Sequence, residues 1–232
     1  MNAAVIAAGG TGSRLGAEIP KQFLEIRGKA LLLYSLEAFE ACPEVEIIVV
    51  VAVSSYIKAT QRLISEAGLK KVQAVVQGGA TRQDSVWAGF KALPSEVEIV
   101  LVHDAARPLV STGLIQTVIN KVRETGAAIA ACPVRDTVKE VHHGTITRTL
   151  PREALFLAQT PQGARKELLQ QAFERAQEEG FQATDEASLL ERLGIPVAVV
   201  PAPTTNLKIT SPEDLLLLEA LLQVTPRRSG CR

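Results

Sequence analysis

The sequence predicts an α/β protein built on a doubly wound, mostly parallel sheet with a projecting β-hairpin. Short, continuously apolar runs alternate with amphipathic segments along the chain. Strands that helices cover on both faces have such continuous hydrophobicity, so a parallel sheet is the expected arrangement. One further segment, 136–150, instead alternates β-branched and polar residues, and this pattern predicts the hairpin.

The individual elements follow from these patterns in chain order. The predicted strands lie at 3–8, 45–53, 71–77, 98–105 and 127–134. The predicted helices lie at 30–41, 54–67, 82–93, 112–125 and 164–179. Three of these helices end at or near a glycine suited to a left-handed cap, namely Gly68, Gly126 and Gly180. A last helix is predicted to begin at Pro212, with Ser211 as its N-cap.

The predicted hairpin turns at His143-Gly144 and has no helix beside it. Because two strands alone bury little of their own surface, we expect the hairpin to project and to pack on another surface. No internal repeat or linker divides the rest of the chain. We therefore predict one domain over residues 1–224, with 136–152 as a protruding arm and 225–232 as a disordered tail.

Composition excludes several classes of function. The 232 residues contain 25 Lys plus Arg and 25 Asp plus Glu, so nucleic-acid binding is not expected and any anion site must be local. No apolar run approaches the roughly 20 residues of a membrane-spanning helix. The N-terminus has no basic leader region, so we expect a cytoplasmic protein without membrane contact. Cys42, Cys132 and Cys231 are too scattered for a zinc site or a disulfide framework and are interpreted as ordinary thiols.

The stretch VIAAGGTGSRLGAEIPKQF, residues 5–23, has the composition of a phosphate-binding loop. Glycine lets backbone N–H groups approach an anion closely. Four glycines follow the first apolar run: Gly9, Gly10, Gly12 and Gly16. Arg14 and Lys21 add positive charge, whereas the glycine spacings of the dinucleotide fingerprint and the P-loop are absent. A surface turn needs only one or two glycines, so a phosphate cradle of another kind is favoured.

Polar residues near other strand ends are expected at the same edge of the sheet, because ligands of doubly wound sheets bind beyond the carboxyl ends of the strands. Asp104 could hold a divalent cation there or accept a hydrogen bond from a ligand hydroxyl. Its alternatives are helix capping or an ion pair with Arg107. His103 is interpreted as a satisfied core histidine. Lys208 precedes the last helix, and from the residues alone a structural and a functional role are equally open.

Two polar segments have capping patterns that give them a structural explanation. Thr81 and Asp84 have capping-box spacing at the start of the third predicted helix. Thr184 is predicted to be an N-cap, with Asp185 and Glu186 favourably placed on the helix dipole.

Taken together, the motifs resemble one enzyme family. AAGGTGSRLG and PKQF are similar to the nucleotide-binding signature of nucleotide-sugar pyrophosphorylases and cytidylyltransferases. GGATRQDSVWAG, VLVHDAARPLV, PVRDTVKEV, LAQTPQ, TDEASLLE and NLKITSPEDL, in this order, resemble the 2-C-methyl-D-erythritol 4-phosphate cytidylyltransferases of the non-mevalonate isoprenoid pathway. The resemblance covers residues 2–222 and implies a Rossmann-like nucleotidyltransferase fold. Gly9 departs from the family pattern, which has alanine there, and is expected to enlarge the space near the base.

The resemblance implies transfer of CMP from CTP to 2-C-methyl-D-erythritol 4-phosphate, with release of pyrophosphate and with Mg²⁺ or another divalent cation. It implies that three cations surround the CTP phosphates: Arg14, Lys21 and Lys208. The nucleotide would further contact Ala8, Gly9, Gly10, Thr11, Gly12, Gly79, Asp84 and Ser85. The sugar phosphate would contact Asp104, Arg107, Thr137, Arg152, Thr160 and Thr184. Asp104 is also the candidate ligand of the metal, which the CTP phosphates would mainly hold.

The resemblance also implies a homodimer in which the arm 136–152 embraces a second subunit and Arg152 reaches the partner's site. The expected chemistry suits the residue types, because a phosphate nucleophile is already anionic and needs no strong general base. What the reaction needs instead is positive charge where two polyanions meet.

Two alternatives stay open at this point. Another cytidylyltransferase on the same scaffold, such as one that uses ribitol 5-phosphate, would share many of these features. A nucleotide-sensing module would bind CTP without chemistry, although it would gain little from paired cations at Lys21 and Lys208. A dehydrogenase is disfavoured, because the dinucleotide fingerprint is missing.

Overall fold

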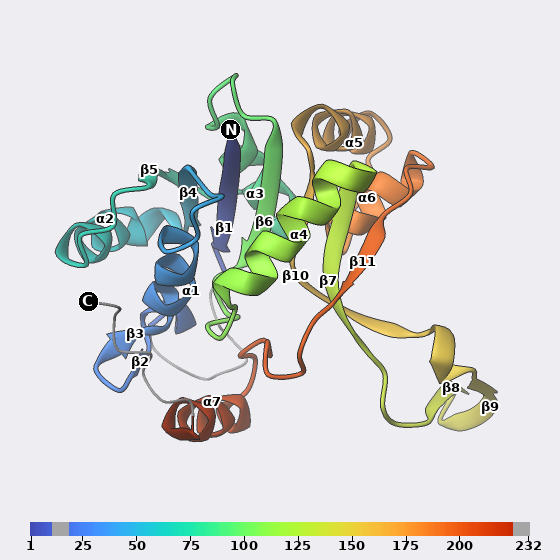
Figure 1. Cartoon of the computed structure of the whole chain (residues 1–232). Coiled ribbons are helices and arrows are strands. Elements are labelled where there is room, and N and C mark those ends of the chain that lie inside the picture. Colours follow the sequence, from blue (N-terminus) through green and yellow to red (C-terminus); the bar gives the residue numbers. More distant parts are fainter. Residues whose placement is uncertain (11–18, 225–232) are drawn as a thin grey trace.

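A seven-stranded sheet forms the centre of the computed structural model, which describes residues 1–10 and 19–224. The strand order is β11-β7-β10-β6-β1-β4-β5 (Figure 1). The strands are β1 (Asn2–Ala8), β4 (Ile47–Ala52), β5 (Val72–Gln77), β6 (Ile99–Asp104), β7 (Ala127–Pro133), β10 (Phe156–Arg165) and β11 (Ala198–Pro201). Every neighbouring pair is parallel except the two pairs of β10. The predicted mostly parallel sheet is therefore confirmed.

Helices cover both faces of this sheet, as the continuous apolar strands predicted. One face carries α1 (Leu31–Glu40), α2 (Ile57–Glu66) and α4 (Thr112–Thr125). The other carries α3 (Arg82–Lys91), α5 (Lys166–Glu178) and α6 (Glu186–Arg192). Successive residues of β1 contribute to opposite sides: Ala4 and Ile6 belong to the first apolar core, and Ala3 and Val5 to the second. A strand that is buried on both faces is therefore apolar along most of its length.

Smaller elements complete the chain around one end of the sheet. They are the 3-10 helices η2 (Lys21–Phe23), η3 (Ser54–Tyr56) and η4 (Arg152–Ala154), and the small hairpin β2 (Glu25–Ile26) and β3 (Lys29–Ala30). The last helix, α7 (Pro212–Val224), begins directly after Ser211, and its Leu218 packs with Leu31 and Ile209. Gly68, Gly126 and Gly180 have φ values of 66°, 88° and 63°, which confirms their predicted left-handed conformation.

The central strand β10 was missed by the sequence prediction, which also placed the start of α5 two residues too early. Pro161 and the flanking Gln159 and Gln162 interrupt its apolar pattern. The pairing of β10 with β7 shifts register between Ala158 and Gln162, so the proline lies at an irregularity where the ladder needs no amide donor. The short strand β11 was also not predicted.

The arm is a separate two-stranded sheet, β8 (Val138–His142) and β9 (Thr145–Leu150), that projects from the main body (Figure 1). At its tip His143 and Gly144 have φ values of 49° and 77°. Two residues with positive φ give a turn whose twist matches that of the paired strands. The hairpin, its turn and its projection are thus confirmed. Val141 and Ile146 stay exposed on it, so the described chain does not cover the arm's apolar side chains.

The cap of α6, the cysteines and the C-terminal residues were also predicted from the sequence. Thr184 is not the N-cap of α6: Asp185 is, because its carboxylate accepts the Ser188 N–H and completes a capping box one residue further on. Cys42 and Cys132 are buried free thiols, as expected. Cys231 and the predicted disordered tail 225–232 lie outside the described residues. Within the described ranges, no helix has the length and apolarity that a membrane span requires.

Close packing of α3 on the sheet leads to a stability prediction. A Cβ atom at Gly89 would lie 2.6 Å from a methyl group of Val5 and 2.6 Å from one of Val51, both in buried strands. Overpacking costs about 1–3 kcal/mol, and the better helix propensity of alanine offsets up to about 1 kcal/mol. Gly89→Ala should therefore lower the free energy of unfolding, by up to about 2 kcal/mol after the full offset, in urea titrations. Gly113→Ala in α4 is the matched control, because its Cβ would meet only Ser111 Oγ, at 4.0 Å. Equal stability of the two variants would contradict this account of the packing.

Candidate active site

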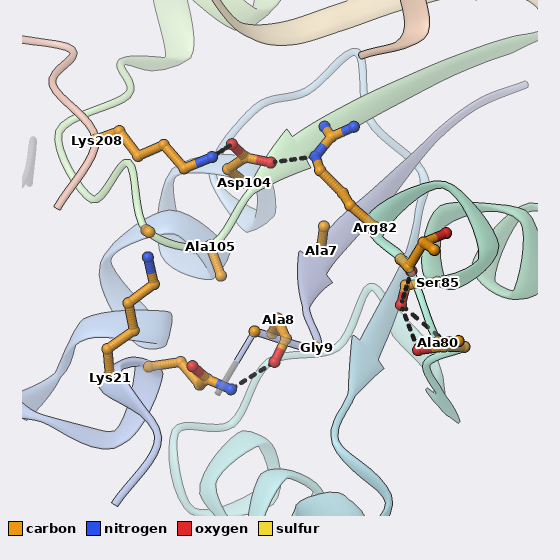
Figure 2. A pocket seen from close by; sticks show the side chains of 15 residues that line it. Ala7, Ala8, Gly9, Lys21, Ala80, Arg82, Ser85, Asp104, Ala105 and Lys208 are labelled. Atoms are coloured by element: carbon orange, nitrogen blue, oxygen red, sulfur yellow. Dashed lines mark hydrogen bonds and ion pairs between the residues drawn. The ribbon is translucent and has the colours of Figure 1, made fainter. Parts of the chain in front are cut away.

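A cavity of about 370 Å³ opens at the carboxyl ends of β1 and β6, the edge where ligands of doubly wound sheets bind. Its walls come from the end of β1, η2, the loop between β5 and α3, the end of β6 and the segment before α7 (Figure 2). The lining residues are Ala7, Ala8, Gly9, Gly10, Lys21, Gln22, Gly79, Ala80, Thr81, Arg82, Ser85, Asp104, Ala105, Ala106 and Lys208. The structure thus brings together many of the residues predicted for the nucleotide, namely Ala8, Gly9, Gly10, Lys21, Gly79, Ser85 and Lys208. Thr11, Gly12, Arg14 and Gly16 lie outside the described residues.

Lys21 is held at the cavity by its neighbour in η2. The buried side chain of Gln22 donates from Nε2 to the carbonyl oxygen of Ala8, at 2.5 Å, and so ties η2 to the end of β1. Lys21 Nζ donates to the carbonyl oxygen of Ile209, at 2.9 Å. Sequence reasoning missed Gln22, and only its position next to a predicted phosphate-binding lysine could have signalled it.

Hydrogen bonds and close packing fix the backbone of the loop between β5 and α3. Gly79 N–H donates to Ser85 Oγ at 3.1 Å, and that hydroxyl donates to the Thr81 carbonyl at 2.8 Å. A Cβ atom at Gly79 would lie 2.3 Å from Asp84 Cβ, so only glycine fits. The predicted capping box is confirmed, because Thr81 Oγ1 accepts from the Asp84 N–H and the Asp84 carboxylate accepts from the Thr81 N–H. Asp84 does not line the cavity but shapes this loop. Next to the loop, a Cβ at Gly9 would contact Ser85 Oγ at 3.4 Å, so glycine widens the cavity there.

Asp104 is the last residue of β6, and its carboxylate lies between two cations. Oδ1 accepts from Arg82 Nε at 3.1 Å, and Oδ2 lies 2.6 Å from Lys208 Nζ (Figure 2). Burial by itself would raise the pKa of this carboxyl, but the charges of Arg82 and Lys208 outweigh burial and hold the pKa well below its usual range. The ion pair with Arg107 that we considered from the sequence is not the one that forms.

Arg82 is the principal site residue that sequence reasoning missed. It is the first residue of α3, and it lines the cavity. Its guanidinium also binds Glu186 in a bidentate pair, with Nη1–Oε1 and Nη2–Oε2 distances of 2.7 and 3.0 Å. Burial disfavours the charged form, but the two carboxylates raise the pKa of Arg82 above its ordinary value. The signal in the sequence was weak, because an arginine inside a capping box has no special spacing.

Behind Asp104, a chain of buried hydrogen bonds uses His103 and Thr160. The Asp104 N–H donates to Thr160 Oγ1 at 3.1 Å, and this oxygen lies 3.0 Å from His103 Nδ1. His103 Nε2 lies 3.2 Å from the Arg107 carbonyl, which can only accept, so Nε2 carries the proton and Nδ1 accepts from Thr160. Burial lowers the pKa of His103 to about 4. The interpretation of His103 as a satisfied core histidine is confirmed.

Several residues predicted for the sugar phosphate do not line the cavity of their own chain. Arg107 is buried, and its Nη1 donates to the carbonyl oxygen of Asn206 at 2.8 Å. Thr160 is engaged with His103 and Asp104, as described. Thr137, Arg152 and Thr184 are exposed, the first two at the base of the arm. Arg152 donates from Nη1 to the Arg135 carbonyl at 2.8 Å.

The cavity offers few protein ligands for a metal. In the described part of the chain, no three His, Cys, Asp or Glu side chains are grouped to hold an ion. Asp104 supplies the one carboxylate that lines the cavity there, and both of its oxygens contact cations. Mg²⁺ commonly takes one or two carboxylates together with substrate phosphates and water. This donor set fits an ion that a triphosphate and water mainly hold.

Fold and cavity together define an α/β nucleotidyltransferase. The chain matches the family 2-C-methyl-D-erythritol 4-phosphate cytidylyltransferase over residues 2–224. It is 43% identical over 222 residues to the protein of that name from Syntrophus aciditrophicus (strain SB), covering 95% of each chain. It is 42% identical over 223 residues to the one from Geotalea uraniireducens (strain Rf4), covering 95% of this chain and 96% of that one.

Solved structures agree with these sequence matches. The structure of 4-diphosphocytidyl-2C-methyl-D-erythritol synthase from Anaerococcus prevotii DSM 20548 superposes with a TM-score of 0.86 at 30% identity, over 96% of each chain. For the 2-C-methyl-D-erythritol 4-phosphate cytidylyltransferase from Thermus thermophilus, the TM-score is 0.78 at 36% identity, over 97% of this chain and 100% of that one. The chain therefore belongs to the 2-C-methyl-D-erythritol 4-phosphate cytidylyltransferase family. It is a transferase that moves CMP from CTP to 2-C-methyl-D-erythritol 4-phosphate in the isoprenoid pathway.

Burial of neutral His103 leads to a prediction about pH. Between its ordinary pKa of 6.5 and its value of about 4 in the fold, the unfolded chain binds a proton that the folded chain does not. The free energy of unfolding should therefore fall as pH decreases through this window, by on the order of 3 kcal/mol from this residue. Above pH 6.5 this contribution is fully present.

Urea titrations between pH 7 and pH 4 would measure the slope. His103→Gln keeps a donor for the Arg107 carbonyl and removes the titrating ring, so much of the slope should disappear. His142→Gln changes an exposed histidine on the arm and should keep the wild-type slope. An unchanged slope in His103→Gln would show that another group causes the acid sensitivity.

Proposed function

We propose that the enzyme catalyses in-line displacement at the α-phosphorus of CTP. A phosphate oxygen of 2-C-methyl-D-erythritol 4-phosphate forms the new P–O bond while the bond from the α-phosphorus to the bridging oxygen breaks, and pyrophosphate leaves. The observation that carries this proposal is the cavity itself, where Lys21 and Lys208 come from two distant chain segments and lie on the same side of the cavity (Figure 2). No general base is needed, because the attacking phosphate is anionic at neutral pH.

The nucleotide is bound between the end of β1 and the loop before α3. Ala8, Gly79 and Ser85 read the cytosine, and the fixed backbone around Gly79 supports this assignment. Gly9 and Gly10 bring main-chain N–H groups near the nucleotide. Asp84 contributes by holding the loop in shape. From the sequence resemblance, Thr11, Gly12 and Arg14 take part as well.

The lysines act on the charge of the transition state. A close cation is worth about 4 kcal/mol at 4 Å and an effective dielectric constant near 20, before screening by water. Two polyanions must meet at the α-phosphorus, so Lys21, Lys208 and Arg14 stabilise the crowded arrangement by position rather than by proton transfer. Mg²⁺ or another divalent cation bound to the triphosphate would add positive charge there, with Asp104 as its protein ligand.

The sugar phosphate is bound next to Asp104. Arg107 is assigned here from the sequence resemblance, and its buried Nε has no hydrogen-bond acceptor among the described residues. Thr160 and Thr184 border this region in the proposal. Thr137 and Arg152 sit on or beside the projecting arm, which suggests that they act on the cavity of a second copy.

A homodimer through the arm 136–152 completes the proposal. The exposed Val141 and Ile146 on the arm, and Phe156 and Leu157 at its return to the sheet, support a covered interface. Residues 1–224 form one domain in this view, and the enzyme works in the cytoplasm.

Substitution of the two lysines tests the proposed catalysis. Lys21→Ala and Lys208→Ala should each lower kcat of pyrophosphate release by roughly a hundredfold or more, because each removes charge stabilisation of the transition state. Thermal unfolding of Lys21→Ala should stay close to wild type, since this side chain is outside the apolar core. Lys208→Ala removes one of the two cations that face the buried Asp104 carboxylate, so it should lose some stability, and its kcat is expressed per folded protein. Lys58→Ala, on the exposed side of α2, is the control and should keep full turnover. Wild-type turnover in either cavity variant would remove that lysine from the mechanism.

Complementation tests whether Arg152 acts on the partner's cavity. In a mixed dimer of Lys21→Ala and Arg152→Ala chains, one site carries both defects and the other carries neither if Arg152 acts in trans. Co-refolding equal amounts should then restore activity at about a quarter of all sites, because half of the dimers are mixed. If Arg152 acts in cis, every site keeps one defect. A mixture as inactive as its parents, with subunit exchange verified by two affinity tags, would reject the shared site.

A further inference from the structure

Four charged side chains of alternating sign form one continuous row beside the cavity. Glu186 pairs with Arg82 through two hydrogen bonds of 2.7 and 3.0 Å. Arg82 Nε then donates to Asp104 Oδ1 at 3.1 Å, and Asp104 Oδ2 lies 2.6 Å from Lys208 Nζ. Arg82, Asp104 and Lys208 line the cavity, whereas Glu186 does not. The row thus connects a residue behind the cavity wall with a lysine inside it.

The burial of Glu186 needs an explanation, because a carboxylate removed from water is costly unless it is fully paired. The residue is only 3% exposed. It is the first residue of α6, but the capping box of that helix is already complete with Asp185 and Ser188. The carboxylate of Glu186 is instead directed at Arg82. Helix formation alone therefore does not account for this residue.

We propose that Glu186 is a positioning residue for cytidylyl transfer, acting on Lys208 through Arg82 and Asp104. A bidentate carboxylate–guanidinium pair fixes the plane of the guanidinium, and this fixes which atom of Arg82 meets Asp104. The orientation of the Asp104 carboxylate then determines where the Lys208 ammonium lies in the cavity (Figure 2). The inference rests on the proposed action of Lys208 on the CTP phosphates.

The row also explains why Arg82 does not simply neutralise Asp104. Without Glu186, the whole charge of Arg82 would act on Asp104, and the carboxylate could turn toward the guanidinium and away from Lys208. With Glu186 in place, Arg82 is shared between two carboxylates, and Asp104 keeps one oxygen for Lys208. Misplacement of a charged group by about 1 Å can cost up to a hundredfold in rate, so a residue outside the cavity can affect turnover.

A double-mutant cycle on kcat tests this coupling. Glu186→Gln keeps the shape of the side chain and removes its charge, and it should lower kcat of pyrophosphate release about tenfold. In the Lys208→Ala background, where the end of the row is missing, the same change should have little further effect. A structural role alone would instead lower kcat by the same factor in both backgrounds. Thermal unfolding of each variant measures any loss of folded protein.

Glu179→Gln is the matched control, because Glu179 pairs with Arg192 at the other end of α6. It also removes a carboxylate–arginine pair from this helix, yet it should leave kcat unchanged in both backgrounds. If Glu186→Gln does not fold, Glu186→Asp keeps the charge, shortens the side chain by one methylene group and enters the same cycle.

The possible outcomes separate this inference from the proposed function. Wild-type kcat in the Glu186 variant, or equal factors in the two backgrounds, would overturn the positioning role and leave Lys208 in the mechanism. Wild-type turnover in Lys208→Ala would overturn the proposed role of the lysine, and the positioning role with it. A loss that depends on Lys208 supports the row.

Discussion

The parallel pairing of β1 with β6 is the constraint on which the site depends. In this register Ala7 lies opposite Asp104, so both strands end at the same level of the sheet. The pairing continues one step further, because the Ala105 N–H donates to the Ala7 carbonyl at 3.1 Å. The glycines that follow β1 and the carboxylate that ends β6 therefore border one cavity, although about 95 residues separate them in sequence.

The other walls of the cavity attach to these two strand ends through backbone groups. Gln22 holds η2 to the Ala8 carbonyl, and the Ile209 N–H donates to the Ala106 carbonyl at 2.8 Å. The Ile209 carbonyl in turn accepts from Lys21. Both lysines thus reach the cavity from segments that are held by hydrogen bonds to backbone carbonyls at the two strand ends. A site that handles a polyanion gains from this arrangement, because preorganised cations need no rearrangement when the charge develops.

Charge at the cavity is balanced by local pairing, since the chain as a whole has no net charge. Asp104 faces two cations and Arg82 faces two carboxylates, so each of these charged side chains has partners of opposite charge. Breaking one such pair leaves an unpaired buried charge, whereas loss of an exposed pair has little effect. The same cavity can therefore be electropositive toward a ligand and still be compatible with a stable fold.

The sequence alone determined the architecture and the family, because both are encoded in local patterns. Continuous apolar runs gave β1, β4, β5, β6 and β7. The turn at His143-Gly144 indicated the arm, and the glycines after β1 indicated the edge of the sheet at which the cavity lies. Where a prediction failed, the local pattern was ambiguous. Polar residues and Pro161 interrupt the apolar pattern of β10. Threonine and aspartate can both cap a helix, so the sequence could not decide between Thr184 and Asp185 as the N-cap of α6.

Only the tertiary structure decided which charges meet. Arg82, Asp104 and Glu186 come from three distant segments, and no spacing in the sequence relates them. Their pairing follows from the stacking of α3 and α6 on one face of the sheet and from the level at which β6 ends. The tertiary structure likewise showed that Thr160 serves the buried hydrogen bonds of His103 and Asp104. Local propensity determines helices and strands. The partner of a buried charge is instead determined by how these elements pack against one another, and this packing is known only from the complete fold.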